Sequence, residues 1–305
     1  MQKIAINNIA KAIIACMLWS TAFAGIKIGL QYTKPLSFAG IRFMLSGVLL
    51  MFFAGRPGNY FKTVFVNFRL IVVLSFVQTF LVYGLFYTGI TFVDGALAAI
   101  IIGSSPLVTA IAAHFLMDHD KMTMKKTAAL VFGIVGMIII TVSHKPWVMT
   151  GLKEVAGILI LLMSTASGSI GNVLVAKYRQ VVKPMIFSSA QLFLGGFGLL
   201  LFSIPVEGVP KLIRVKEYYV ALGWLAFLSA AAFALWFNLL KKPEIKVSEL
   251  NVWKFIIPLF GAIFSWILLP EEQPEIFAIT GMILVAFSIV LYQYFADEKG
   301  RKLQR

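Results

Sequence analysis

The chain has 305 residues, of which 60% are hydrophobic and 13% are charged, and its mean hydropathy is +0.89. A soluble domain carries roughly 25% charged residues, so this composition excludes a water-soluble protein and indicates one that lies mostly in lipid. The net charge of +14 is not the mark of a nucleic-acid partner, because the chain has no soluble basic domain to hold one. In a membrane protein, Lys and Arg instead gather in cytoplasmic loops.

Ten apolar segments follow one another along the chain, each close to the roughly 20 residues that cross a bilayer. Breaks rich in turn and charged residues, such as GRPGNYFK and DHDKMTMKK, separate them. We therefore expect an all-α fold, a polytopic membrane protein with ten transmembrane helices. The predicted spans are 9–30, 36–54, 69–90, 95–116, 126–143, 154–176, 185–204, 217–239, 248–269 and 275–295.

The first span resembles a secretory signal peptide, since lysines precede its apolar run and an Ala-x-Ala sequence ends at Ala24. The apolar stretch continues to Leu30, so we expect a retained span, with cleavage as the alternative. With the N-terminus inside, 18 Lys and Arg lie in inner segments, 6 in outer loops and 3 within spans. The positive-inside rule then predicts a protein of the cell inner (plasma) membrane with both termini in the cytoplasm.

Two pairs of matching stretches indicate an internal duplication. PLSFAGIRFMLSG, from Pro35, matches PMIFSSAQLFLGG, from Pro184, at an offset of 149 residues. PLVTAIAAHFL, from Pro106, matches PLFGAIFSWIL, from Pro258, at an offset of 152. We expect a first repeat over residues 1–148 and a second over 149–305.

Each predicted repeat has five spans, an odd number, so the second repeat would insert upside down. Inverted repeats are the architecture of many secondary transporters, in which the substrate site lies at the repeat interface near the middle of the membrane. The alternative is that duplication only doubled a packing module.

The sequence resembles the drug/metabolite transporter superfamily, in particular its EamA-type members with two five-helix repeats. The stretches that support this are LWSTAFAGIKIGL (18–30), PLSFAGIRF (35–43), GALAAIIIGSSPLVTAIAAHFL (95–116), SELNVWKFIIPLFGAIFSWILLPEE (248–272) and ITGMILVAFSIVL (279–291). The resemblance implies a ten-helix inner-membrane carrier for small organic metabolites, often an exporter of amino acids. One departure is Met117-Asp118-His119, which stands where the family usually has a glycine-glutamate pair.

Polar side chains within spans generally face protein or a water-filled cavity. In the third span, polar residues recur every four positions and form one face; in the ninth, Asn251 and Lys254 share a face with Pro258. The Tyr residues have a packing alternative, and Trp236 has an alternative as an interfacial residue. The candidate substrate-binding residues are Trp19, Gln78, Tyr83, Tyr87, Ser105, Trp236, Asn251 and Lys254.

The three bases within spans have different expected roles. Lys254 lies about 9 Å from the inner end of its span at 1.5 Å per residue, so it either binds substrate or snorkels to the interface. Lys27, near an outer end, is expected to snorkel. Arg42, which resembles an arginine that the family keeps, is expected to orient helices or cap carbonyls. The candidate structural or gating residues are Arg42, Pro106, Gln191 and Pro258, with the prolines permitting helix bending.

The 13 acidic residues all fall in loops, tails or span edges. Carriers that exchange protons for lipophilic cations commonly need a buried carboxylate, so a cationic drug is not the expected substrate. A pathway with bases and neutral hydrogen-bonding groups favours zwitterionic or anionic metabolites. His114 is expected to be an interfacial residue rather than a titrating group in transport.

The sequence lacks the motifs that are typical of ATP-driven transporters and of metal sites. No GxxxxGK[ST] sequence is present, so ATP is not the direct energy source. The three histidines fit no metal-ligand spacing, and Asp118-His119-Asp120 is expected to be a solvated turn rather than a metal site. We expect no enzyme activity, no cofactor and no metal.

These features together predict a secondary-active exporter of small zwitterionic or anionic metabolites, such as amino acids, that works by alternating access. Its expected partners are the small-molecule substrate, the lipid bilayer and, if the carrier uses one, a coupling ion. One alternative is a transporter or flippase of a nucleotide-sugar or lipid-linked group. Another is a structural or regulatory membrane subunit that transports nothing. The sequence leaves the oligomeric state open.

Overall fold

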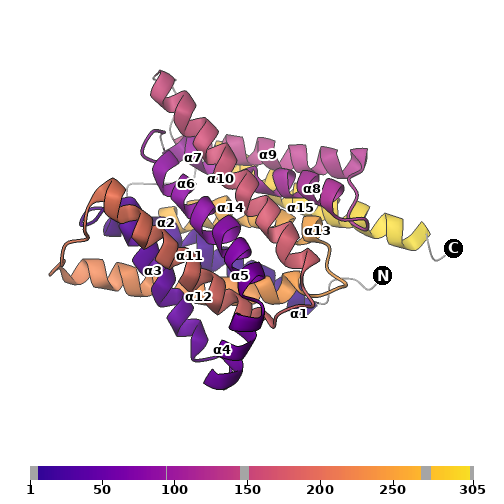
Figure 1. Cartoon of the computed structure of the whole chain (residues 1–305). Helices are drawn as coiled ribbons and strands as arrows, with labels where there is room; N and C mark the ends of the chain where they lie inside the picture. The colour runs from indigo at the N-terminus through magenta and orange to yellow at the C-terminus, as the bar shows by residue number, and fades with distance from the viewer. Residues whose placement is uncertain (1–5, 94, 145–150, 269–275, 303–305) are drawn as a thin grey trace.

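The computed structural model describes residues 6–93, 95–144, 151–268 and 276–302, and every regular element in these ranges is a helix (Figure 1). The all-α prediction is therefore confirmed. The elements are α1 (Ile6–Ser20), α2 (Ala22–Gly29), α3 (Pro35–Met51), α4 (Pro57–Val66), α5 (Phe68–Ser75), η1 (Phe76–Leu81), α6 (Val82–Gly89), α7 (Gly95–Gly103), α8 (Ser105–Leu116), α9 (Met124–His144), α10 (Leu152–Lys177), α11 (Pro184–Glu207), α12 (Lys216–Leu240), α13 (Val247–Asn251), η2 (Val252–Phe255), α14 (Ile256–Leu268) and α15 (Ile276–Lys302).

Eight helical segments in the described ranges are long and apolar enough to cross a membrane, which makes this a polytopic membrane protein. A shorter apolar helix, α3, has 17 residues. The predicted ninth span begins as α13, η2 and α14, and its last residue lies outside the described residues, as does the start of the tenth. The total of ten spans stays a prediction.

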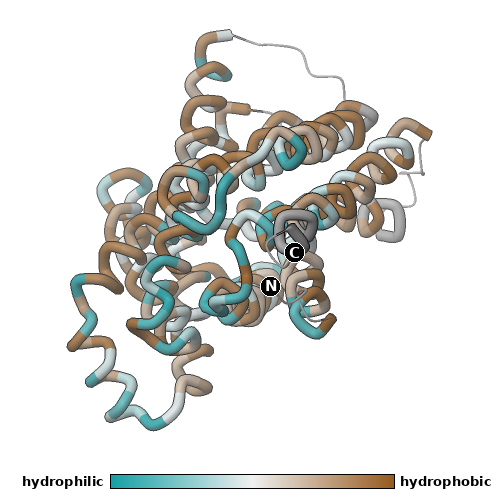
Figure 2. The backbone as a smooth tube through the Cα atoms, turned by 90° about the vertical axis from the view of Figure 1, so that its right-hand side faces the viewer, coloured by the Kyte–Doolittle hydropathy of each residue, from teal (hydrophilic) through white to brown (hydrophobic). Residues whose placement is uncertain are grey.

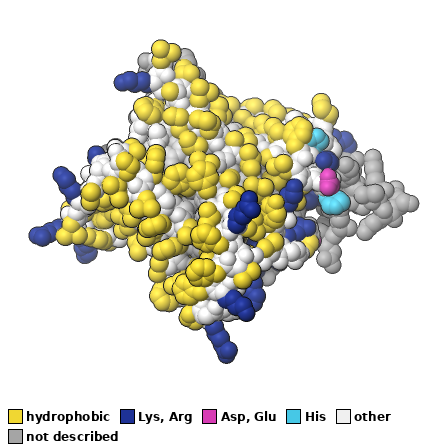
Figure 3. Space-filling view, in the orientation of Figure 1, with side chains coloured by type: hydrophobic (Ala, Val, Ile, Leu, Met, Phe, Trp, Pro, Cys, Tyr) yellow, Lys and Arg dark blue, Asp and Glu magenta, His cyan; other side chains and the backbone are white. Residues whose placement is uncertain are grey.

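The surface agrees with a membrane location. Brown, hydrophobic backbone dominates the helices, whereas teal segments concentrate in the connections between them (Figure 2). Hydrophobic side chains cover most of the face in Figure 3, and Lys and Arg protrude at its margins and at a few places within it. The start of α1 and the end of α15 lie on the same side of the molecule, on the right in Figure 1.

Proline sets the start of several helices. Pro35 and Pro184 each stand at the beginning of a long helix, where a missing N–H costs nothing and the fixed φ suits the helix. Pro57 does the same for α4. The stretch that we expected to be a loop between the second and third spans is thus partly helical.

Two pairs of equivalent helices from the predicted repeats pack closely against each other. Helix α3 lies along α11, and α9 lies along α15. Glycine makes the second contact possible, because a Cβ on Gly136 would lie 2.7 Å from the carbonyl oxygen of Gly281, and one on Gly281 would lie 2.5 Å from that of Gly136. Small residues that let backbones approach are the usual means of helix association in membranes.

The remaining irregular backbone is concentrated in four spans. The first is interrupted at Thr21, the third contains the π-helical turn η1, the fourth is interrupted at Ser104, and the ninth contains the 3₁₀ turn η2. Pro106 lies just after one break, and Pro258 lies three residues after η2, so the lost proline N–H explains both irregularities. Irregular backbone within the membrane is tolerated where it lines a cavity.

Candidate functional site

A cavity of about 230 Å³ lies among the broken spans. It takes residues from the first, third, fourth, sixth, eighth and ninth predicted spans, and also from α3 in the second. Its walls are mostly apolar or aromatic, with a few polar groups. The lining residues are Trp19, Ala22, Ile26, Arg42, Gln78, Val82, Tyr83, Phe86, Ala99, Ile102, Gly103, Ser105, Ser164, Thr165, Gly168, Ser169, Asn172, Phe233, Trp236, Lys254, Ile257 and Pro258.

Lys254 meets the cavity between two tryptophans. Its Nζ lies 5.0 Å from the ring centroid of Trp236 and 5.8 Å from that of Trp19, and the two rings are 5.2 Å apart in an edge-on arrangement. An ammonium over the faces of desolvated indoles gains about 2 kcal/mol or more, which helps to keep this base within the membrane. Lys254 makes no hydrogen bond or ion pair with any described residue, so its three N–H donors remain available.

Arg42 also lines the cavity and is fixed there by hydroxyl groups. Its Nε and Nη2 donate to the Oγ of Ser229 at 3.0 and 2.8 Å, and its Nη1 donates to the hydroxyl of Tyr87 at 3.3 Å. The guanidinium also lies 4.9 Å from the ring centroid of Phe43. Arg42 is only 3% exposed, so these neutral partners hold a charge that no described carboxylate balances.

A chain of three amide side chains runs from the cavity lining to a buried residue behind it. Gln78 Nε2 donates to Asn172 Oδ1, and Asn172 Nδ2 donates to Asn251 Oδ1, both at 3.1 Å. Asn251 Nδ2 then donates to the backbone carbonyl of Val247 at 2.9 Å. We call Gln78, Asn172 and Asn251 the amide relay; it connects η1, α10 and α13.

The π-helical turn that presents Gln78 is held by hydroxyls of α10. Ser167 Oγ donates to the carbonyl of Val77, and Ser164 Oγ donates to that of Val82, each at 2.7 Å. These bonds satisfy carbonyls around the irregular turn, which otherwise would lie unpaired in the membrane. A π-helical turn in a helix frequently marks a functional site.

The structure brings most of the predicted substrate-binding residues together. Trp19, Gln78, Tyr83, Ser105, Trp236 and Lys254 line the cavity. Tyr87 and Asn251 are fully buried behind the lining and contact it through Arg42 and Asn172 respectively. The structure shows where these residues lie but does not test their roles, which stay predictions.

The predicted structural or gating residues also fall into those that line the cavity and those that do not. Arg42 and Pro258 line the cavity, whereas Pro106 and Gln191 are buried away from it. Gln191 Oε1 accepts a hydrogen bond from the hydroxyl of Thr79 at 2.6 Å, and its Nε2 has no partner among the described residues.

Three partner residues were not among our candidates: Asn172, Ser229 and Thr79. A signal for two of them exists in the sequence. Arg42 and Gln191 are equivalent in the two predicted repeats at an offset of 149 residues. Thr79 and Ser229 are equivalent at an offset of 150, which differs by only one residue. The bonds Arg42–Ser229 and Gln191–Thr79 are therefore the same contact made twice between the predicted repeats. Asn172 had no comparable signal.

The electrostatics of the cavity are one-sided. Arg42 and Lys254 line it, and none of its described lining residues is acidic. In the part of the chain that the structure describes, no group of three His, Cys, Asp or Glu is placed to hold a metal ion. The arrangement is suited to noncovalent binding of a ligand with an anionic group and an apolar or aromatic body.

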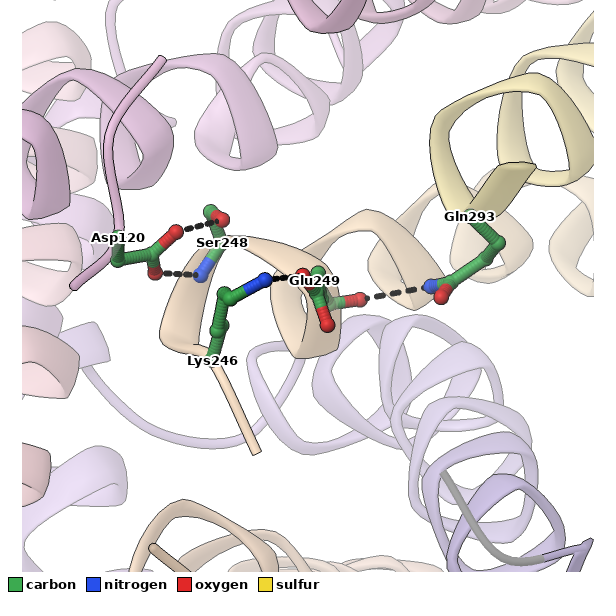
Figure 4. Close-up of polar contacts among 5 residues, drawn as sticks. All are labelled: Asp120, Lys246, Ser248, Glu249 and Gln293. Carbon is green, nitrogen blue, oxygen red and sulfur yellow. Dashed lines mark hydrogen bonds and ion pairs between the residues drawn. The ribbon is translucent and has the colours of Figure 1, made fainter. Parts of the chain in front are cut away.

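A polar cluster joins the loop after α8 to α13 (Figure 4). Asp120 accepts hydrogen bonds from the backbone N–H of Ser248, at 2.8 Å, and from its hydroxyl. Lys246 pairs with Glu249 at 2.6 Å, and Gln293 Nε2 donates to the carbonyl of Glu249 at 3.1 Å. We call Asp120, Lys246, Ser248, Glu249 and Gln293 the closing cluster.

The closing cluster corrects one expectation. Asp118-His119-Asp120 was expected to be a solvated turn, and this is wrong for Asp120, which is only 2% exposed. The first N–H groups of α13 need an acceptor, and the Asp120 carboxylate supplies it. His114 shapes the same loop, since its Nδ1 accepts a hydrogen bond from the N–H of Met122 at 3.1 Å.

Comparisons with known proteins agree with this architecture. The model of the EamA-like transporter family matches residues 8–142 and 155–294. The chain is 24% identical to "Uncharacterized transporter YoaV" of Bacillus subtilis, over 90% of this chain and 92% of that protein. A crystal structure with 14% sequence identity superposes with a TM-score of 0.79 over 98% of this chain and 99% of the other, which shows a shared fold.

Two further relatives have names that mention a cargo. The chain is 24% identical to the "Probable amino-acid metabolite efflux pump" of Salmonella typhimurium, over 96% of this chain and 95% of that protein. It is 25% identical to the "S-adenosylmethionine/S-adenosylhomocysteine transporter" of Chlamydia muridarum, over 88% of this chain and 86% of the relative.

Proposed function

Because the chain belongs to the EamA-like transporter family, within the drug/metabolite transporter superfamily, we propose that it exports small zwitterionic or anionic metabolites, such as amino acids. Transport would be secondary-active and would follow an alternating-access cycle in the cell inner membrane, with both termini in the cytoplasm. The two predicted repeats would exchange roles about the central cavity during this cycle.

The observation that most supports the substrate class is the charge of the cavity. Two bases, Arg42 and Lys254, line it, and its described lining contains no carboxylate to neutralise them. A charge left unpaired in a low-dielectric site is costly, so a ligand that brings an anionic group is favoured there over a cation. The indoles of Trp19 and Trp236 and the rings of Tyr83 and Phe233 would contact its organic part.

The relatives support the same class. One named relative is an efflux pump for amino-acid metabolites, and the name of another includes S-adenosylmethionine, a derivative of an amino acid. Both cargoes are compatible with a cavity that accepts a carboxylate at Lys254.

Flux in proteoliposomes tests the proposal. We expect the purified protein to transport radiolabelled amino acids or organic acids, and Lys254→Met to lower uptake at least about tenfold, because an ion pair in a desolvated site contributes more than 1.4 kcal/mol. Lys27→Met is the matched control, since Lys27 is an exposed base in the first span outside the cavity lining, and it should leave flux unchanged. Lipophilic cations carried in place of acids, or full activity in Lys254→Met, would contradict the substrate assignment.

A further inference from the structure

We infer that α4 is an interfacial anchor that binds the acidic phospholipids of the inner leaflet of the membrane. Exposed phenylalanines of α4 would lie among the acyl chains, and three bases on and beside α4 would contact the headgroup phosphates. The inference goes beyond the proposed function, because it assigns a partner to a helix that contributes nothing to the described lining of the cavity.

Helix α4 has an apolar face that the protein covers on one edge only. Residues four apart lie on the same side of a helix, so Tyr60 lies beside Val64. This edge is packed, since Tyr60 is 6% exposed, its hydroxyl shares a hydrogen bond of 3.0 Å with Ser189 Oγ of α11, and Val64 packs against the core. Phe61 and Phe65 form the adjoining edge, which is open, because their side chains are 50% and 76% exposed.

The open edge needs a partner because α4 is short. Isolated helices of fewer than about 12–15 residues are marginal in water, and α4 has 10. Exposed rings also flank α4 along the chain, since Phe52 and Phe53 follow α3 and Phe68 is the first residue of α5. Aromatic residues on the apolar face of a short amphipathic helix are typical of helices that lie in a membrane interface.

The charges around α4 are of one sign. Arg56 precedes the helix, Lys62 lies within it and Arg69 is the second residue of α5; all three are exposed. None of their side chains makes a hydrogen bond or an ion pair with a described residue. The first acidic residue of the chain is Asp94, and α11, against which α4 packs, has its acidic residue, Glu207, at its far end.

This part of the surface is therefore complementary to an anionic partner. On the face in view in Figure 3, the lower end of the molecule, where α4 lies in Figure 1, shows Lys and Arg beside hydrophobic side chains and no Asp or Glu.

The predicted orientation places α4 at the cytoplasmic surface of the membrane, because it connects the inner ends of the second and third spans. A helix of this kind lies in the plane of the interface, with its apolar face at the boundary between headgroups and acyl chains. The cytoplasmic leaflet carries a negative surface potential, which attracts bases close to it. A lipid surface thus satisfies both the open aromatic edge and the unpaired bases, whereas a free anion would satisfy the bases alone.

Native mass spectrometry of the purified full-length protein tests the inference. The probes are dioleoyl phosphatidylglycerol, which is anionic, and dioleoyl phosphatidylcholine, which has the same acyl chains and no net charge. We expect the first phosphatidylglycerol to bind at least about tenfold more tightly than the first phosphatidylcholine, because the three bases attract only the anionic headgroup.

A triple variant locates the headgroup contact. Arg56→Gln combined with Lys62→Gln and Arg69→Gln removes the three bases around α4, and the preference for phosphatidylglycerol should fall to about twofold or less. All three side chains are exposed, so the variant should keep the wild-type melting temperature in detergent without lipid.

The matched control neutralises three exposed bases on the predicted outer side. Lys211→Gln combined with Arg214→Gln and Lys216→Gln changes the net charge by the same amount, before and at the start of α12. This variant should keep the wild-type preference, which would show that the position of the bases matters rather than the total charge.

Phe65→Ser tests the contact with the acyl chains. It removes an exposed ring from the open edge of α4, and phosphatidylglycerol should bind at least about threefold more weakly, because less apolar surface is covered. Phe277→Ser is the control, since that ring is similarly exposed, at 69%, but lies at the start of α15. Its binding of phosphatidylglycerol should match the wild type.

The outcomes decide the inference as follows. Equal affinity of the wild type for the two lipids, or the same preference in the two triple variants, overturns it. Unchanged binding in Phe65→Ser overturns it as well, because a site that contacts headgroups alone is not an interfacial anchor. Loss of the preference in the Arg56, Lys62 and Arg69 variant alone, with weaker binding in Phe65→Ser, supports it.

Discussion

Arg42 shows how a full charge is kept within the membrane without a carboxylate. Three of its N–H groups donate to two hydroxyls, and the hydroxyl of Ser229 in turn donates to the carbonyl of Leu225 at 2.7 Å. The charge is thus dispersed into neutral dipoles that the helices α6 and α12 hold in place. Because Ser229 belongs to the second predicted repeat, the same bonds join the two halves of the molecule.

A double-mutant cycle measures the interaction energy between Arg42 and Ser229. Arg42→Met and Ser229→Ala should each lower the free energy of unfolding, and the pair should show a coupling energy of about 1.5–3 kcal/mol, the range for hydrogen bonds to a charged group. Thermal or denaturant unfolding in detergent provides the measurement. Arg42→Met combined with Ser188→Ala is the control cycle and should be additive within about 0.5 kcal/mol. Additivity in the Ser229 cycle would show that the contact contributes nothing to stability.

At the scale of helices, stability depends on how closely α9 and α15 approach. Lipid tails are as apolar as the side chains they contact, so burial of apolar area does little to hold these helices together. Backbone proximity at Gly136 and Gly281 instead allows extended van der Waals contact along both helices.

Gly136→Ala tests this contact. The added Cβ would lie 2.7 Å from the Gly281 oxygen and 2.9 Å from Val285 N, so the helices must separate, at a cost of about 1–3 kcal/mol. We expect a lower melting temperature in detergent. Gly223→Ala is the matched control, because no heavy atom lies within 4 Å of the position that its new methyl group would occupy, and alanine is the better helix former. A melting temperature that falls equally in both variants would count against a specific role for the α9–α15 contact.

Across the whole molecule, the cavity lining extends from Ile26 and Phe86, each three residues from the ends of α2 and α6, to Asn172, five residues from the end of α10. The closing cluster joins α13 to the loop after α8, on the side of Figure 1 where α1 begins. With the predicted orientation, we expect this cluster to hold the cytoplasmic side shut.

The labelling rate of Cys16 can report how often the closing cluster opens. It is the single cysteine of the chain and is fully buried in α1, which packs against η2 and α14. Asp120→Ala removes two hydrogen bonds to Ser248, worth about 1–2 kcal/mol together, and should raise the open population and the maleimide labelling rate of Cys16 about 5–30-fold.

Asp118→Ala is the control for this experiment. Asp118 lies in the same loop but is exposed, so the labelling rate should stay at the wild-type value. Equal rates in all three proteins would show that the Asp120–Ser248 contact does not hold the closure.

Much of the fold could be predicted because apolar length and turn residues fix where spans begin and end. The predicted spans 185–204 and 217–239, for example, correspond to α11 (Pro184–Glu207) and α12 (Lys216–Leu240). Helix α4 was missed, since its 10 residues mix apolar and polar positions and are too few to cross a membrane. The interruption near Pro258 was expected from proline chemistry, whereas the π-helical turn at η1 has no sequence signal of that kind.

Residues of the site were harder to predict than spans. Spacing along one helix showed that Asn251, Lys254 and Pro258 share a face, and the structure places Lys254 and Pro258 on the cavity. Spacing does not show which helices face each other or how each is rotated. The contacts of Asn172 and Ser229 and the burial of Asp120 depend on which helices are neighbours and on the rotation of each helix, so the sequence did not predict them.

The repeated contact made by Arg42 and Gln191 has an energetic consequence for the empty protein. Two identical halves would make the two conformations of an inverted repeat equivalent, with equal populations. Here the Arg42–Ser229 copy of the contact has two charge-assisted bonds, and the Gln191–Thr79 copy has a single neutral one. In the proposed alternating-access cycle, the difference between arginine and glutamine would bias the resting equilibrium by a factor of ten for every 1.4 kcal/mol, about the scale of a single hydrogen bond.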